Sequence, residues 1–220
     1  MRAQTTIPFD RIRAWFFDLD GTLMDTDDQA VDSLAHRLRI LGAARAQRVA
    51  RRLVMMGETP MNSMVTVLDV VGLDTLLFRV RRMLSGRVKP TFRIIDGVKP
   101  LLEHLAERAP LAVVTTRSQE AAAAFLQQHG LSDYFRLLVT QETTRRLKPH
   151  PEPVLYAART FGLAPEACAM VGDTTVDVRA GLGAGTWTLG VLCGFGEEGE
   201  LRQAGAHLIL PSTADLLAWV

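Results

Sequence analysis

Cysteine is scarce in this sequence of 220 residues, and long apolar runs are missing. The two cysteines, Cys168 and Cys193, lie inside or beside short apolar runs, which predicts buried thiols and argues against a disulfide framework. No run reaches the length of a membrane-spanning helix, and residues 1–13 contain no continuous apolar stretch of signal-peptide length. We therefore expect a protein of the cytoplasm.

A surplus of charge of one sign is also missing. The chain carries 25 basic and 24 acidic residues, for a formal net charge of +1, so we expect neither nucleic acid nor an anionic membrane as a partner. Only three of the basic residues are lysines (Lys89, Lys99 and Lys148), which makes a lysine at a chemically meaningful position informative. Apolar residues make up 48% of the chain and charged residues 22%, which is typical of a globular protein with a core.

Short apolar runs alternate with longer helical patterns, which predicts βαβ units and a parallel sheet. Ser118 can cap a helix over residues 119–129 that Gly130 ends, and the prolines at 151 and 153 open a helix that runs to Phe161. The expected strands are nearly all apolar, as strands buried on both faces are: 12–17, 111–115, 135–140, 168–171, 187–191 and 207–210.

The stretch from residue 26 to residue 83 has a different pattern. It contains no convincing strand, and Leu34, Leu38 and Leu41 recur at helical spacing. This pattern predicts a small all-helical insertion after the first strand. We assign residues 1–22 and 93–220 to an α/β core and residues 23–92 to the helical insertion.

Two carboxylates follow the first strand, in the run Asp-Leu-Asp-Gly-Thr-Leu of residues 18–23. Open α/β sheets bind ligands at the carboxyl ends of their strands, and a turn at Gly21 would bring Asp18 and Asp20 to one point. Close carboxylates repel, so their joint ionisation requires a cation or a raised pKa on one of them. Mg²⁺ is the hard divalent ion that best suits phosphate chemistry. The alternative is an acidic turn that pivots on Gly21.

Two further strand ends carry groups suited to phosphate. Thr115 and Thr116 end the second strand of the core, where a hydroxyl and the following helix N-terminus can donate to phosphate oxygens, although threonine is also simply a good strand residue. Lys148 lies in a proline-rich loop before a helix and can reach a phosphoryl group as a point charge. The alternative is a solvated surface lysine.

A second pair of carboxylates follows the strand at 168–171. Asp173 stands at the strand end, and Asp177 comes four residues later, which returns it to the same face of a helical turn. The alternative is that Asp173 only caps a helix.

Together these elements resemble the haloacid dehalogenase-like hydrolase superfamily. Its motifs are matched by residues 18–23, by Thr115, by Lys148 with the proline after it, and by residues 172–177. The resemblance covers essentially the whole chain and is strongest to the phosphoglycolate phosphatase and pyrophosphatase group, which carries a helical cap after the first motif. It implies a Rossmann-like parallel sheet core with a small helical cap.

The resemblance also implies a mechanism. Asp18 would attack phosphorus and become an acyl phosphate, and Asp20 would protonate the leaving oxygen and then deprotonate the hydrolytic water. Thr115 and Lys148 would hold the phosphoryl oxygens. Thr116, next to Thr115, is a further candidate for substrate binding.

Mg²⁺ is the implied cofactor. Asp173 would bind it together with Asp18 and the backbone carbonyl of Asp20, and Asp177 would be an outer or alternative ligand.

The expected activity is that of a phosphatase acting on a small phosphorylated metabolite. A pyrophosphatase or a sugar-phosphate mutase would use the same motifs, whereas a dehalogenase lacks the aspartate at the position of Asp20. A non-catalytic phosphate-binding protein would be expected to have lost a catalytic carboxylate, and none is missing.

Arg117 is a candidate for substrate selectivity. It follows Thr116 beside a predicted helix N-terminus, where a cation does not suit the helix dipole. We expect it to meet a second anionic group of the substrate in a two-pronged contact, while the cap turn at residues 57–59 closes over the rest of the ligand. The alternatives are a surface arginine or one that pairs with the cap.

Overall fold

The computed structural model describes residues 7–25 and 93–220. The chain divides into two units, Met1–Thr26 with Phe92–Val220, and Asp27–Thr91, and all described residues belong to the first. The predicted helical cap therefore lies outside the described residues, except for residues 23–25, and so does its turn at residues 57–59. Among the described helices, none is both long and apolar enough to cross a membrane.

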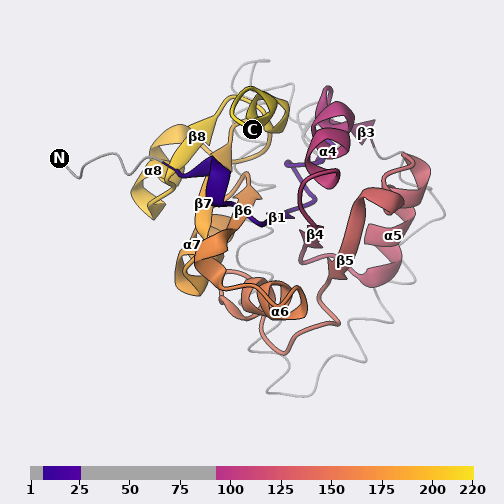
Figure 1. The fold of residues 1–220 in the computed structure, drawn as a ribbon, viewed down its shortest axis with the longest axis horizontal. Helices are drawn as coiled ribbons and strands as arrows, with labels where there is room; N and C mark the ends of the chain where they lie inside the picture. The colour runs from indigo at the N-terminus through magenta and orange to yellow at the C-terminus, as the bar shows by residue number, and fades with distance from the viewer. Residues whose placement is uncertain (1–6, 26–92) are drawn as a thin grey trace, which may run out of the picture. The chain divides into compact units, whose positions relative to one another are not determined.

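A six-stranded sheet with the order β5-β4-β1-β6-β7-β8 forms the centre of the described unit (Figure 1). Every neighbouring pair is parallel, which confirms the predicted Rossmann-like α/β class. The strands are β1 (Ala14–Phe17), β4 (Leu111–Val114), β5 (Phe135–Val139), β6 (Cys168–Gly172), β7 (Trp187–Val191) and β8 (Leu208–Leu210).

A second, two-stranded sheet was not predicted. β2 (Met24–Asp25) and β3 (Arg93–Ile94) pair antiparallel, with Met24 opposite Ile94. β2 lies where the chain leaves the core after β1, and β3 lies where the chain returns to it, so their pairing holds these two points together. Two residues per strand are too few to give an alternating apolar pattern, so the sequence carried no signal for them.

The helices begin close to the positions that the sequence predicted. The Ser118 side chain accepts a hydrogen bond from the backbone N–H of Ala121 (3.3 Å), and Gly130 follows this helix with a φ of 63°. The described helices are α4 (Val98–Ala106), α5 (Gln119–Gln128), α6 (Glu152–Thr160), α7 (Thr175–Ala184) and α8 (Glu198–Ala204), with short 3-10 turns at η1 (Phe9–Arg11), η3 (Ser132–Tyr134), η4 (Pro165–Ala167) and η5 (Thr213–Ala218).

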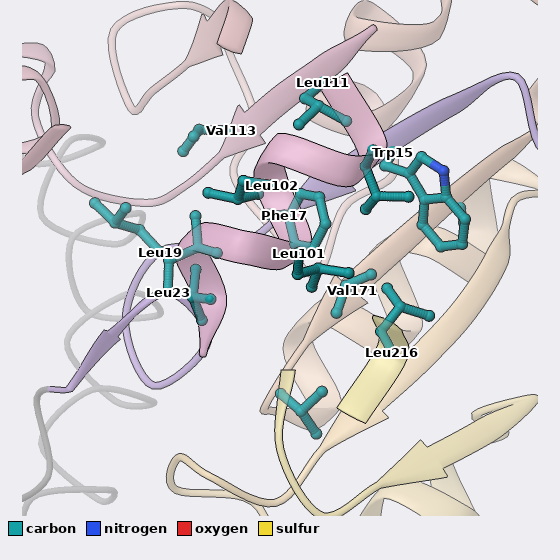
Figure 2. Packing of buried hydrophobic residues seen from close by; sticks show 14 of the residues in the cluster. Trp15, Phe17, Leu19, Leu23, Leu101, Leu102, Leu111, Val113, Val171 and Leu216 are labelled. Atoms are coloured by element: carbon teal, nitrogen blue, oxygen red, sulfur yellow. The ribbon is translucent and has the colours of Figure 1, made fainter. Parts of the chain in front are cut away.

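Strand β1 is buried on both faces, and its residues alternate between two cores. Trp15 and Phe17 pack with α4 and α5, whereas Ala14 and Phe16 pack with α6 and α7. Figure 2 shows the first of these cores, where Leu101 and Leu102 of α4 lie against the sheet. This continuous apolar strand at the centre of the sheet holds the residue that follows it, Asp18, in a fixed place.

Helix α7 lies close against the sheet at Gly181. A Cβ atom there would lie 2.5 Å from Cγ2 of Thr188 and 3.0 Å from Cβ of Met170. We expect Gly181→Ala to lower the free energy of unfolding by about 1–3 kcal/mol through overpacking. The matched control is Gly199→Ala in α8, where a Cβ would meet nothing within 4 Å and stability should stay equal or rise. Urea unfolding of both variants measures this, and equal stabilities would contradict it.

Candidate active site

The carboxyl ends of three adjacent strands bring the predicted site residues together. Asp18 follows β1, Thr115 follows β4 and Asp173 follows β6, with Phe17 in register with both Val113 and Val171. Parallel neighbours in register end at one edge of the sheet, so these side chains converge there, as the sequence predicted.

Lys148 lies buried among the carboxylates, with 3% of its side chain exposed. Its Nζ donates to Oδ1 of Asp18 and to Oδ1 of Asp177, each at 2.6 Å. The interpretation of Lys148 as a solvated surface residue is therefore wrong. This lysine reaches the sheet edge from the loop between β5 and α6 and joins two acidic residues that are far apart in the sequence.

Asp177 also closes the first turn of α7. Its Oδ2 accepts hydrogen bonds from the backbone N–H of Thr174 (3.1 Å) and from the Thr174 hydroxyl (2.7 Å). Thr174, not Asp173, is the N-cap of this helix, which removes the alternative that Asp173 merely caps it. Oδ1 of Asp177 accepts from Lys148 and Oδ2 accepts from Thr174, so hydrogen bonds to both oxygens fix the orientation of this side chain.

Three buried carboxylates come close enough to share one cation. One oxygen each of Asp18, Asp173 and Asp177 lies within 4.8 Å of the others. The ligands are hard carboxylate oxygens, which Mg²⁺ prefers. Three negative groups face one buried lysine, so the described residues leave an excess of negative charge that a divalent cation would offset.

The pKa values show this excess. Burial raises the pKa of Asp18 to about 7, although the charge of Lys148 opposes the shift. Burial likewise raises the pKa of Asp173 well above its ordinary value, and the charges of Asp177 and Asp18 add to the effect. Burial alone would lower the pKa of Lys148, but Asp177 and Asp18 outweigh it and the pKa is raised. The lysine is therefore a fixed positive charge.

Asp20, the second carboxylate of the run after β1, pairs with Arg117. Nε of Arg117 donates to Oδ2 of Asp20 at 2.6 Å, and Nη2 donates to Oδ1 at 2.5 Å. The backbone of Arg117 is also held in place. Its N–H donates to Oγ1 of Thr115 (3.1 Å), and its carbonyl oxygen accepts from the backbone N–H of Gln141 (3.1 Å). The sequence analysis did not pair Arg117 with Asp20.

Similarity to known proteins agrees with this arrangement. A family model described as haloacid dehalogenase-like hydrolase matches residues 15–191. The chain belongs to this family. It is 30% identical over 217 residues to a phosphoglycolate phosphatase of Photorhabdus laumondii, an alignment that covers 95% of this chain and 92% of that protein. The resemblance inferred from the motifs is thus confirmed.

Other relatives of this hydrolase carry different activities in their names. A pyrophosphatase PpaX of Bacillus pumilus is 30% identical over 210 residues, covering 95% of this chain and 96% of that protein. Among solved structures, a haloacid dehalogenase-like hydrolase of Streptococcus pneumoniae superposes with a TM-score of 0.70 at 25% identity, covering 96% of this chain and 99% of that one.

The two threonines that follow β4 in this hydrolase, Thr115 and Thr116, differ in their surroundings. Thr115 is buried, and its hydroxyl oxygen accepts from the N–H of Arg117, which leaves the hydroxyl proton for donation to another group. Thr116 is half-buried beside it, two residues before Ser118 caps α5.

Two contacts to Asp173 were missed by the sequence analysis. The backbone N–H of Phe195 donates to Oδ2 of Asp173 at 2.7 Å, and the Thr22 hydroxyl approaches Oδ1 at 3.4 Å. A backbone donor has no residue type to reveal it. The signal that was available is the pair of glycines, Gly194 and Gly196, directly after a buried strand.

The raised pKa of Asp18 predicts an unusual pH dependence in the metal-free protein. Between pH ~4 and pH ~7 the folded state binds more protons than the unfolded state, so the free energy of unfolding should fall as pH rises. The contribution approaches ~1.4 kcal/mol per pH unit. Asp18→Asn should remove it. Urea unfolding in EDTA across this range measures both proteins, and equal slopes would refute the assignment.

Proposed function

We propose that this hydrolase is a Mg²⁺-dependent phosphatase that cleaves a small phosphorylated metabolite through an aspartyl phosphate on Asp18. The observation that carries the proposal is the buried Lys148 that joins Asp18 to Asp177, with Asp173 beside them. This arrangement supplies an oriented carboxylate, a fixed positive charge and hard oxygen ligands at one sheet edge. Membership in a hydrolase family, with phosphatases and pyrophosphatases among the relatives, supports it.

The first half-reaction transfers the phosphoryl group to the protein. A carboxylate oxygen of Asp18 forms a bond to phosphorus as the bond from phosphorus to the leaving oxygen breaks, and Asp20 gives that oxygen its proton. Lys148 and the hydroxyl of Thr115, with Thr116, offset the charge on the phosphoryl oxygens.

The second half-reaction regenerates the carboxylate. Water attacks the phosphorus of the acyl phosphate, Asp20 takes the proton of the water, and the bond from phosphorus to Asp18 breaks to release phosphate. Because the same face of the site serves both steps, one carboxylate can act first as the acid and then as the base.

Mg²⁺, when bound, would offset negative charge on the phosphoryl oxygens. Asp18, Asp173, Asp177 and the backbone carbonyl of Asp20 are the groups proposed to hold it. The raised pKa values of Asp18 and Asp173 fit this role, because a cation at this point would favour their ionised forms.

A pyrophosphatase is the second candidate. The two relatives described above, a phosphoglycolate phosphatase and a pyrophosphatase, match this chain at the same 30% identity, so neither activity is favoured by likeness alone. A sugar-phosphate mutase would use the same core residues. Release of phosphate from phosphoglycolate, pyrophosphate and hexose phosphates, measured side by side, separates the three. The cytoplasmic location and the expected lack of nucleic-acid and membrane partners stay predictions.

The nucleophile and the acid can be tested separately. Asp18→Asn should abolish Mg²⁺-dependent release of phosphate from p-nitrophenyl phosphate and formation of a phosphoenzyme, since an amide is a poor nucleophile. Asp20→Asn should slow hydrolysis of an alkyl phosphate by about 10²- to 10⁴-fold, and that of p-nitrophenyl phosphate much less, because p-nitrophenolate leaves without a proton. Equal losses on both substrates would remove the acid role from Asp20.

Arg117 is proposed to contact a second anionic group of the substrate. Its guanidinium already binds both oxygens of Asp20, so a substrate carboxylate would have to share or displace that pair. Arg117→Ala should raise KM for phosphoglycolate about 10-fold or more and leave KM for p-nitrophenyl phosphate nearly unchanged.

Arg117→Lys is the matched control, since it keeps the charge and loses the fork. An equal change in both KM values would show that Arg117 acts only through its contact with Asp20. Unchanged KM values for both substrates would show that Arg117 does not take part in substrate binding.

A further inference from the structure

The loop after β7 lies against Asp173. We call residues 193–196 the glycine loop. The residue before it, Leu192, still belongs to the sheet edge, because its backbone N–H donates to the carbonyl oxygen of Leu210 in β8 (3.0 Å). Its Phe195 N–H donates to Oδ2 of Asp173 at 2.7 Å, and Asp173 itself is fully buried. The loop thus supplies a charge-assisted hydrogen bond to a carboxylate that no solvent reaches.

Neither glycine of the loop has room for a side chain. A Cβ at Gly194 would lie 2.1 Å from Oδ2 of Asp173 and 2.6 Å from the carbonyl oxygen of Gly21. A Cβ at Gly196 would lie 1.9 Å from the backbone oxygen of Asp173. These spacings are far inside van der Waals contact, so the loop approaches Asp173 as closely as it does only because both residues are glycine.

The same loop fixes the turn that follows Asp20. Sγ of Cys193 donates to the carbonyl oxygen of Gly21 (3.4 Å). Outside the loop, the hydroxyl of Thr213 in η5 donates to the carbonyl oxygen of Thr22 (2.6 Å) and holds the same turn. On the other side, a Cβ at Gly21 would lie 2.3 Å from Oδ2 of Asp173. The Asp173 carboxylate is therefore enclosed between two glycine turns.

We propose that the glycine loop is a positioning element that fixes the carboxylate of Asp173 for Mg²⁺ and thereby sets the affinity of the site. This inference rests on the proposed function, which makes Asp173 a ligand. Groups that hold a metal-binding side chain in place change metal affinity by about 10- to 100-fold when they are altered, because the ligand must otherwise be ordered during binding.

The test is calorimetric titration of the full-length, chelator-stripped chain with Mg²⁺ alone. Gly194→Ala should raise the dissociation constant for Mg²⁺ by about 10- to 100-fold, because the added methyl group displaces Oδ2 of Asp173. Gly199→Ala is the matched control: it makes the same substitution five residues later, where a Cβ meets nothing within 4 Å, and should bind as the wild type does.

A second pair of variants covers the case in which Gly194→Ala does not fold. Phe195→Pro removes the N–H donor without adding an atom at Gly194, and Phe195→Leu keeps the donor. Thermal unfolding in EDTA identifies the folded variants. We expect weaker Mg²⁺ binding for Phe195→Pro than for Phe195→Leu.

The outcomes separate the role of the glycine loop from the proposal that the protein is a Mg²⁺-dependent phosphatase. Wild-type affinity in folded Gly194→Ala or Phe195→Pro would overturn the role of the glycine loop and leave the phosphatase proposal standing. Failure of the wild-type chain to bind Mg²⁺ would overturn both. Equal weakening in Gly199→Ala would show that the effect does not depend on contact with Asp173 and would also overturn the role of the loop.

Discussion

The burial of three carboxylates around one lysine is the constraint on which the rest of the sheet edge depends. Charged groups removed from water are stable only when opposite charges and hydrogen bonds replace the lost hydration. Lys148 supplies one positive charge to Asp18 and Asp177, and the pKa of Asp18 is nevertheless raised to about 7. The folded chain therefore holds a site whose excess of negative charge is unfavourable until a cation balances it.

The three ion pairs at this edge of the sheet differ in their exposure to solvent. The pairs of Lys148 are buried, with about a tenth or less of each side chain exposed, so they keep one geometry. The pair of Arg117 and Asp20 is partly open to solvent, at 29% and 21%. Water competes for its charges, so this pair can separate at modest cost. The buried pairs of Lys148 therefore keep a fixed geometry, whereas the pair of Arg117 and Asp20 can open and close again.

The sequence could predict the features that follow from residue type and from the spacing of apolar residues, namely the strands and the polar residues at their ends. Apolar runs located β1 and β6, and strand ends located Asp18, Thr115, Lys148 and Asp173. It could not predict the pair of Arg117 with Asp20, because either side chain has several rotamers and only the packed loop selects one. It also could not predict the Phe195 N–H at Asp173, since every residue but proline carries such a donor. The first strand was predicted two residues too early, because Ile12 is buried without joining the sheet.

The short antiparallel pair of β2 and β3 lies where the chain leaves the core after β1 and where it returns before α4. Met24 and Ile94 are opposite each other, so the two chain ends that enter and leave residues 26–92 are held side by side by the core itself. The entropy of closing a loop depends only weakly on its length once its ends are fixed. The segment between them can consequently lengthen, shorten or be exchanged during evolution at little cost to the stability of the sheet.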